Sequence, residues 1–293
     1  MRLTALLLLS ATALPAQEVL GRRERVFTLS ERVSSGDDVR IFARQGTITV
    51  TEGSGSTVEF RAEKERGDVD DIGFVVRRGG GLTICAIYDS DDECSDDGVR
   101  SEGRRWRNWG DRARANITVT VPRGMRLRIG SGNGDVSVTS AATEARVASG
   151  NGRVRVSGVR GQVTASSGNG RVTVEDVTGQ VRASTGNGDV SIGTVSGPVN
   201  ASSGNGDILV SMDRIAGDGD MEFSSGNGRI EVTLPSDFSA EVDATTGSGR
   251  ITTDFPIKVM GRLTRSRLRG TIGDGGRRLR MSTGNGSMEL RRR

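Results

Sequence analysis

The residues that follow seven of the Gly-Asn-Gly and Gly-Ser-Gly motifs in this chain are acidic or basic, and most of them recur at regular intervals. They are Asp135, Arg153, Arg171, Asp189, Asp207, Arg229 and Arg250. If neighbouring motifs lie one strand spacing apart, Asp135 can pair with Arg153 across turns. Arg171 can pair with Asp189 in the same way. Such a row either docks a charged polymer or is a solvated ladder worth about a few tenths of a kcal/mol per pair.

Paired carboxylates can hydrolyse glycosidic bonds, and Asp189 and Asp207 occupy equivalent positions in neighbouring repeats. The chain has no histidine to act as a base near neutral pH, and its lysines are limited to Lys64 and Lys258. Adjacent aspartates at a turn, without a cleft, are weak evidence for catalysis. We therefore expect a non-enzymatic protein, with a β-helix polysaccharide lyase or hydrolase as the weaker alternative.

Two segments carry residue types that bind cations. The stretch GNGDVSV is similar to the calcium-binding nonapeptide G-G-x-G-x-D-x-U-x, and the motif interval of 18 residues is twice nine. Calcium needs several oxygens per site, yet the motif occurs once per 18 residues and arginine takes about half of the aspartate positions. The acid-rich segment 89–97, DSDDECSDD, lacks a defined ligand spacing, and we interpret it as a solvated loop. We expect no metal and no cofactor.

The two cysteines, Cys85 and Cys94, lie nine positions apart. This spacing excludes a CxxC redox or metal site. In an oxidising compartment the pair can form a single local disulfide that closes the acidic loop. Two free thiols remain the alternative, because a bridge demands a short Cα separation that the sequence does not show.

Basic residues concentrate near the C-terminus. Residues 258–293 contain 11 of them against Asp274 and Glu289, a local net charge of +9, whereas the whole chain carries +4. They are Lys258, Arg262, Arg265, Arg267, Arg269, Arg277, Arg278, Arg280, Arg291, Arg292 and Arg293. Such a segment either attracts anionic envelope polymers or lipid headgroups, or it covers the open end of a strand stack. Nucleic acid is disfavoured, because aromatic residues for base stacking make up 3% of the chain.

The motifs that carry these residues are evenly spaced. Gly-Asn-Gly begins at Gly132, Gly150, Gly168, Gly186 and Gly204, each 18 residues after the last, and related motifs begin at Gly226, Gly247 and Gly284. A fixed period of this size is typical of a solenoid, in which each unit stacks on its neighbours. The 37 residues from Gly247 to Gly284 correspond to about two further turns.

Inside each repeat, aliphatic and polar residues alternate. The repeat that begins at Gly168 has its aliphatic residues at Val172, Val174, Val177, Val181 and Ala183. A period of two indicates strands with one buried face, and the offset Val177 is expected to turn inward at a corner. Stacked in parallel at about 4.8 Å per turn, these units predict an all-β, single-domain parallel β-helix with about 18 residues per turn.

The Gly-Asn-Gly motif suits a reversal of the chain. Glycine accepts positive φ freely, and Asn tolerates it best among the other residues. Asparagines at one offset can also form an amide ladder along the axis. Its predicted members are Asn133, Asn151, Asn169, Asn187, Asn205, Asn227 and Asn285. Ser or Thr precedes each motif, which predicts a row of hydroxyl groups beside the ladder.

The chain divides into three parts by pattern. Residues 1–16 combine Arg2, an apolar run and a small-residue exit, which predicts a cleaved signal peptide and therefore an exported protein. Residues 17–114 alternate without the period, and we expect a divergent capping section with an irregular loop at 89–114, where Trp106 and Trp109 are candidate anchors. Regular repeats occupy residues 115–293. No later stretch is apolar enough to cross a membrane.

The strand GTITV, the element ITVTVPRGMRLRIGSGNGDVSV and the reiterated SGNGRVRV and GQVTASSGNG segments resemble an adhesin-like family of β-strand-repeat domains. The family is a domain of unknown function in exported bacterial and archaeal proteins. The resemblance covers about Val39 to Leu290, and VPRG is its most specific part. It implies a β-helical surface or periplasmic module and supplies no catalytic residues.

We therefore expect a rigid envelope or surface module that binds polymeric ligands through a repetitive flank. A periodic surface offers many weak, equivalent contacts to a periodic partner such as an anionic polysaccharide, so avidity replaces one tight site. The alternative is a scaffold that assembles end to end through exposed terminal turns. The oligomeric state does not follow from the sequence.

Overall fold

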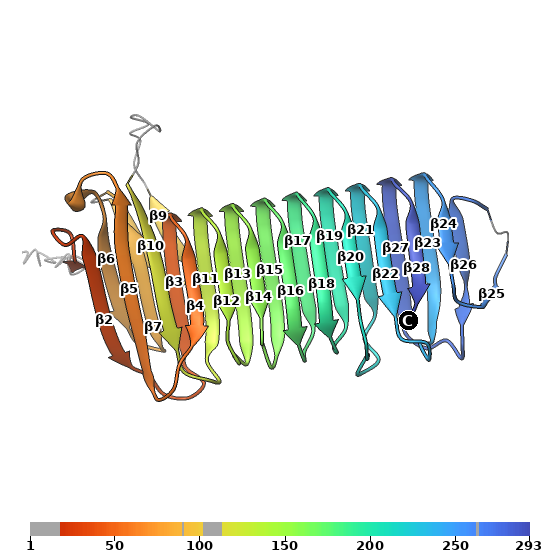
Figure 1. The fold of residues 1–293 in the computed structure, drawn as a ribbon, viewed down its shortest axis with the longest axis horizontal. Coiled ribbons are helices and arrows are strands. Elements are labelled where there is room, and N and C mark those ends of the chain that lie inside the picture. Colours follow the sequence, from red (N-terminus) through yellow and green to blue (C-terminus); the bar gives the residue numbers. More distant parts are fainter. Residues whose placement is uncertain (1–17, 90, 102–112, 262–263) are drawn as a thin grey trace, which may run out of the picture.

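The computed structural model describes residues 18–89, 91–101, 113–261 and 264–293. In this part of the chain, nearly all regular structure is strand, and the strands form two long sheets that face each other (Figure 1). We call the 14-stranded sheet A and the 12-stranded sheet B. The expected signal peptide at 1–16 and the two tryptophans of the 89–114 loop lie outside the described residues.

Sheet A contains strands from both ends of the chain. In spatial order they are β1 (Val19–Leu20), β6 (Gly73–Arg78), β7 (Leu82–Ile87), β3 (Asp38–Gln45), β11 (Arg126–Asn133), β13 (Glu144–Asn151), β15 (Gln162–Asn169), β17 (Val181–Asn187), β19 (Val199–Asn205), β21 (Met221–Asn227), β27 (Arg278–Asn285), β23 (Ala240–Ser248), β26 (Arg267–Ile272) and β25 (Ile257–Val259).

Sheet B supplies the opposite wall. In spatial order it contains β2 (Val26–Arg32), β5 (Thr57–Arg66), β10 (Arg114–Val121), β4 (Ile48–Glu52), β12 (Val136–Thr139), β14 (Val154–Ser157), β16 (Val172–Val177), β18 (Val190–Val195), β20 (Ile208–Ser211), β22 (Ile230–Leu234), β28 (Met288–Arg292) and β24 (Ile251–Thr253). The strands β8 (Asp92–Ser95) and β9 (Gly98–Ser101) form a separate hairpin, and η1 (Val69–Asp71) is one short 3₁₀ turn.

Each regular turn contributes one strand to each sheet, and like strands stack in parallel. Val154 pairs with Val172, and Val172 pairs with Val190, all within sheet B. Their side chains are at most 1% exposed, and the corner residue Val177 is equally buried. The prediction of an all-β solenoid with like residues in columns is confirmed.

Small aliphatic side chains fill the middle of the core, and aromatic rings close its two ends. Phe27 stacks on Phe74 with ring centroids 4.9 Å apart at the N-terminal end. Phe238 and Phe255 make an edge contact at the C-terminal end. Rings cover the open face of a column of valines, because they bury more area per residue. The chain has few aromatic residues because the core uses them mainly at its two ends.

At the C-terminal end, the order of strands in space departs from their order in the sequence. β27 pairs in parallel with β21 on one side and β23 on the other, and β28 lies between β22 and β24 in the same way. After β22 the chain leaves the place of the next turn open and forms β23 and β24 one turn further along the axis. It then forms the antiparallel cap of β25 and β26. Finally β27 and β28 fill the open place between β21–β22 and β23–β24 (Figure 1).

Two expectations about this region need correction. Of the basic segment 258–293, the part in β25 and β26, which includes Lys258, Arg267 and Arg269, does lie at the open end of the stack, whereas residues 278–292 form an interior turn with neighbours on both sides. The segment between Gly247 and Gly284 does not form two further turns. It forms the end of one turn and then the β25–β26 hairpin, in which β26 runs antiparallel to both β23 and β25.

The N-terminal end is built by a similar detour. β3 and β4 form an interior turn, although β7 and β10, which lie outside them, come later in the sequence. The antiparallel strands β5 and β2 then continue sheet B. Lys64 on β5 is buried, and its Nζ donates hydrogen bonds to the carbonyl oxygens of Gly21 and Arg22 at 2.7 and 2.9 Å and to that of Val69 at 2.5 Å. These bonds fix the terminal segment onto the cap.

Candidate functional site

The hydroxyl groups that precede each Gly-x-Gly motif lie inside the fold. They belong to Ser131, Ser149, Ser167, Thr185, Ser203, Ser225, Thr246 and Thr283, all of which are buried. Each donates a hydrogen bond to a glycine carbonyl of the neighbouring turn, as Ser167 does to Gly152 at 2.7 Å. Thr283 donates to Gly228, and Thr246 to Gly286, which follows the spatial order of the turns. This row is a structural element.

The asparagines form a continuous ladder on the exposed edge. Each side-chain Nδ2 donates to the Oδ1 of the neighbouring Asn, over distances of 2.7–2.8 Å from Asn151 bonding to Asn133 through Asn285 bonding to Asn227. The ladder is polar and periodic. Each interior amide group already donates a hydrogen bond to one neighbour and accepts one from the other, which limits the hydrogen bonds that it can form with a ligand.

The expected backbone role of the asparagines is wrong. They lie in extended strands, and the non-glycine residues with positive φ among the described residues are Asp176 and Thr194. The third residue of the motif is the one whose backbone position requires glycine. Gly170 has φ of +156°, and a Cβ there would lie 2.2 Å from the carbonyl oxygen of Gly152. The close approach of successive turns requires glycine at this point.

The charged row next to the ladder is tied to the stack. Arg153 pairs with Asp135, and Arg171 with Asp189, both at 2.8 Å, as the register predicted. Asp189 also accepts a hydrogen bond from the backbone N–H of Asp207 at 3.1 Å. The carboxylates therefore bridge turns through both side-chain and backbone bonds.

The pKa of Asp189 is shifted in the direction opposite to that required of the general acid in a glycosidase. The hydrogen bond from Arg171 and the backbone bond from Asp207 lower the pKa of this carboxyl, and burial opposes them less strongly. A general acid needs a raised pKa so that it carries a proton near neutral pH. Asp189 is therefore unsuited to the role of a general acid, and its bonds to Arg171 and Asp207 give it a structural role between turns.

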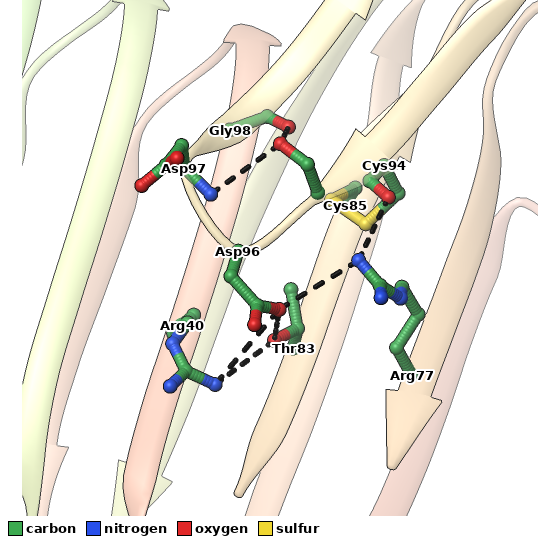
Figure 2. The surroundings of a disulfide bond; sticks show 9 residues. Arg40, Arg77, Thr83, Cys85, Cys94, Asp96, Asp97 and Gly98 are labelled. Carbon is green, nitrogen blue, oxygen red and sulfur yellow. Dashed lines mark hydrogen bonds and ion pairs between the residues drawn. A yellow bond between two sulfur atoms is a disulfide. The ribbon is translucent and has the colours of Figure 1, made fainter. Parts of the chain in front are cut away.

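The two cysteines form a disulfide, with Cα atoms 5.8 Å apart. The bridge ties β8 to the outer side of β7, where Cys85 lies beside Thr83 and the hairpin passes above (Figure 2). Around Asp96 of the hairpin turn, Arg77 and Arg40 approach its carboxylate at 3.6 and 4.0 Å. The acid-rich segment is thus an ordered hairpin on sheet A in its described part; Asp92 is buried, and the other described acids of the segment are exposed to solvent.

Among the described residues, no group of three or more His, Cys, Asp or Glu side chains could hold a metal ion. In the acidic segment, Asp92 is fully engaged. Its carboxylate accepts hydrogen bonds from the backbone N–H groups of Tyr88 and Asp89 and contacts Arg44 at 3.1 Å. No helix in the described part of the chain is long and apolar enough to cross a membrane.

The basic C-terminal residues do not gather in one patch. Arg269 and Arg280 lie on sheet A, whereas Arg291 lies on β28 of sheet B. Several are paired, such as Arg269 with Asp243 at 2.9 Å and Arg291 with Glu231 at 3.0 Å. The local charge excess along the sequence is therefore spread over two opposite surfaces.

A different basic surface, which the sequence analysis missed, lies on the outer side of sheet A. We call it the arginine face, and it consists of Arg40, Arg126, Arg128, Arg146 and Arg182. In the strand register, Arg40 lies beside Arg128, and Arg128 beside Arg146; Thr164 and Arg182 continue the row. The signal was present in the outward positions of the alternating strands. It was overlooked because Arg40 is distant in the sequence.

The arginine face is grooved and partly neutralised. Two hollows with volumes of ≈ 410 and ≈ 290 Å³ lie on it, and Arg128 and Arg146 line both. Asp38 pairs with Arg126 at 2.6 Å, and this hydrogen bond lowers the pKa of the Asp38 carboxyl despite partial burial. Arg128 and Arg146 remain 39% and 58% exposed, so both can reach a ligand.

Comparison with solved structures finds bacterial proteins of similar length. One is described as a "putative adhesin" from Bacteroides fragilis, with 15% identity, TM-score 0.49, and coverage of 91% of this chain and 97% of that chain. A "putative lipid binding protein" from Parabacteroides distasonis has 15% identity, TM-score 0.45 and the same coverage of 91% and 97%. A "putative cell adhesion protein" from Clostridium sporogenes has 9% identity, TM-score 0.28 and coverage of 92% and 100%.

No curated protein sequence matches the chain. The family model described as Toastrack DUF4097 matches residues 37–291, which include every regular turn of the solenoid. This match agrees with the resemblance carried by the GTITV, VPRG and Gly-Asn-Gly segments. The protein belongs to the Toastrack DUF4097 family.

Proposed function

We propose that this protein is an exported, non-enzymatic envelope or surface module that binds anionic polysaccharides through the arginine face. The observation that carries the proposal is the register of Arg40, Arg128 and Arg146 on three adjacent strands. Neighbouring strands lie about 4.8 Å apart. Arg128 and Arg146 are 39% and 58% exposed on this rigid surface, whereas Arg40 beside them is 14% exposed and paired with Asp38.

A polyanion suits such a row because both partners are periodic. Each arginine contact at an exposed site is weak, but contacts to one polymer chain form together and add to the avidity. Guanidinium groups also bind carboxylates with two parallel hydrogen bonds, which fixes orientation as well as charge. A repeating surface is thus an effective receptor without any single deep pocket.

The existing ion pairs on the arginine face do not prevent binding. Arg146 contacts Glu144 at 2.7 Å, and its side chain remains 58% exposed. Exposed pairs of this kind contribute about 0.2–1 kcal/mol, so a ligand carboxylate can replace the internal partner. The Asp and Glu residues then act as competitors that limit affinity for small anions.

Export is supported by the sequence pattern of residues 1–16 and by the disulfide, because such bonds persist mainly in oxidising compartments. A non-enzymatic role is supported by the lowered pKa of Asp189 and by its bonds to the neighbouring turns. An envelope location would bring the protein next to anionic polymers.

The test is binding of the purified protein to polygalacturonate, a carboxylate polysaccharide, with neutral dextran as the negative control. We expect binding to polygalacturonate that weakens steeply as salt rises, because exposed charges are screened within about 8 Å at physiological ionic strength. The double variant Arg128→Ser/Arg146→Ser should bind about tenfold more weakly, which corresponds to two lost contacts of about 0.7 kcal/mol each.

The matched control is Arg155→Ser/Arg229→Ser, which removes the same charge away from the arginine face, because Arg155 lies on β14 of sheet B and Arg229 directly precedes β22. We expect its affinity to stay close to that of the unmodified protein. An equal loss in both double variants would show that net charge, and not the arginine face, attracts the polymer. Binding that ignores salt would also contradict the proposal.

A further inference from the structure

One turn of the solenoid lacks a short connection between its two strands. β7 and β10 form the turn outside β3 and β4, and residues 88–113 join them. In the described part of this connection, β8 and β9 form an antiparallel hairpin that belongs to neither long sheet. The stacking of turns does not require the hairpin, because the other regular turns close without one.

The hairpin lies on the outer side of sheet A, over a small apolar cluster of its own. Phe42, Val75 and Ile87 point away from the main core and pack with the Cys85–Cys94 disulfide. All are at most 7% exposed. The outer side of a sheet normally faces solvent, so apolar side chains there stay buried only where another segment covers them. The hairpin covers this cluster.

The turn of the hairpin places carboxylates on the arginines beneath it. Asp97 contacts Arg128 of the arginine face at 2.8 Å. Asp96 approaches Arg40 at 4.0 Å and Arg77 at 3.6 Å, and it accepts a hydrogen bond from Thr83 at 3.3 Å (Figure 2). The hairpin thus neutralises one end of the arginine row, whereas Arg146 and Arg182 lie beyond its described contacts.

We propose that the β8–β9 hairpin is an intramolecular carboxylate ligand that covers the N-terminal part of the arginine face, and that opening the Cys85–Cys94 disulfide frees this part for an acidic polysaccharide. The inference rests on the proposed function and adds a competitor to it. The carboxylates of Asp96 and Asp97 occupy the positions that uronate groups of the ligand would take.

Opening the bridge requires a dithiol reductant. Two electrons and two protons pass from the reductant to the S–S bond, which becomes two cysteine thiols, and the reductant becomes a disulfide. An isolated two-stranded hairpin is marginally stable in water. Without the bridge, the hairpin can leave sheet A while the strands beneath it remain paired to their neighbours.

The experiment compares the unmodified protein with Cys85→Ser/Cys94→Ser and with Asp96→Asn/Asp97→Asn. Hydrogen exchange of residues 92–101 reports hairpin release, and titration with polygalacturonate reports affinity. In the cysteine variant we expect faster exchange at these residues, unchanged exchange in β11–β20, and about fivefold tighter binding. The aspartate variant should bind about fivefold more tightly with its disulfide intact, because two competing carboxylates are gone.

The control Asp218→Asn/Asp237→Asn removes the same charge from exposed positions at the C-terminal loops, and it should change affinity by less than about twofold. Faster hairpin exchange with unchanged affinity would overturn the inference while leaving the proposed function intact. Slow exchange in the cysteine variant would show that the bridge does not hold the hairpin, and would also overturn it. Binding by the cysteine variant alone would support the inference and refute ligand binding by the bridged protein.

Discussion

At the scale of single residues, two parallel rows of hydrogen bonds keep the turns in register. The buried hydroxyl row satisfies glycine carbonyls that would otherwise lie unpaired beside the core, as between Ser167 and Gly152. The asparagine row runs in one direction, so that each interior member donates to one neighbour and accepts from the other. The position of an asparagine in the row therefore decides which hydrogen bonds its substitution removes.

The direction of the ladder gives a matched pair of variants. Asn169 donates to Asn151 and accepts from Asn187, so Asn169→Asp loses a donor and places a carboxylate against the Oδ1 of Asn151. We expect a loss of about 1 kcal/mol in the free energy of unfolding. Asn133 is the accepting end of the ladder, and Asn133→Asp should cost far less. Urea titrations of the two variants measure the difference, and equal losses would contradict the directional ladder.

The lowered pKa of Asp189 makes its contribution to stability dependent on pH. A carboxyl whose pKa is lower in the folded state stabilises the fold above its unfolded pKa, and this stabilisation disappears as pH falls through the folded pKa. We expect Asp189→Asn to be less stable than the unmodified protein by about 0.5 kcal/mol at pH 7. The difference should shrink as pH falls below 3.8, the ordinary pKa of an aspartate, and through the lower pKa of Asp189 in the folded state. A gap in urea midpoints that persists at low pH would show that Arg171 is not the cause.

At the scale of elements, the order of the turns in space differs from their order in the sequence at both ends of the stack. β27 and β28 supply the missing turn between β21–β22 and β23–β24. Their inward residues, Leu279, Met281, Met288 and Leu290, are at most 3% exposed. The last turn of the sequence is therefore part of the continuous core.

Truncation after Arg277 tests this arrangement. Removal of residues 278–293 should detach β23–β26 from the remaining turns, because their parallel partner and shared core are lost. We expect residues 236–277 to become sensitive to limited proteolysis while β11–β20 stay resistant. Continued protection of 236–277 would mean that β23 docks on β21 directly, and that the interior turn is dispensable.

At the scale of the whole molecule, antiparallel caps and short edge strands oppose end-to-end growth. The edge strands β1, β24 and β25 are two or three residues long, whereas β2 has seven. Short edges offer few unpaired backbone groups to a second copy. This arrangement favours a binding module over the scaffold alternative.

We accordingly expect the protein to sediment as a monomer over a wide concentration range. The sedimentation coefficient should be low for the mass, because the stacked turns form a long, narrow body (Figure 1). Growth of filaments with concentration would instead support the scaffold, with β2 as the edge to examine first. Retention of a monomer when polygalacturonate is absent would leave the binding proposal as the simpler account.

The amino-acid pattern alone predicts the structure of a single turn. Alternating valines, the interval of 18 residues and the Ser-Gly-Asn-Gly signature specify two strands, one buried face and the columns of hydroxyl and amide groups. The register of Val154, Val172 and Val190 follows directly, because a slip by one residue would expose the whole buried set. The pairs of the charged row follow from the same register.

The order of the turns and the position of the arginine face depend on contacts between segments that are distant in the sequence. β23 and β27 present the same backbone ladder, but β23 carries Gly-Ser-Gly where β27 carries Gly-Asn-Gly, so Asn285 of β27 can extend the asparagine ladder from Asn227 and Ser248 of β23 cannot. Caps, connection lengths and the aromatic ends select one order. Arg40 meets Arg128, and the hairpin acids meet both, because contacts between segments far apart in sequence form only once that order is set.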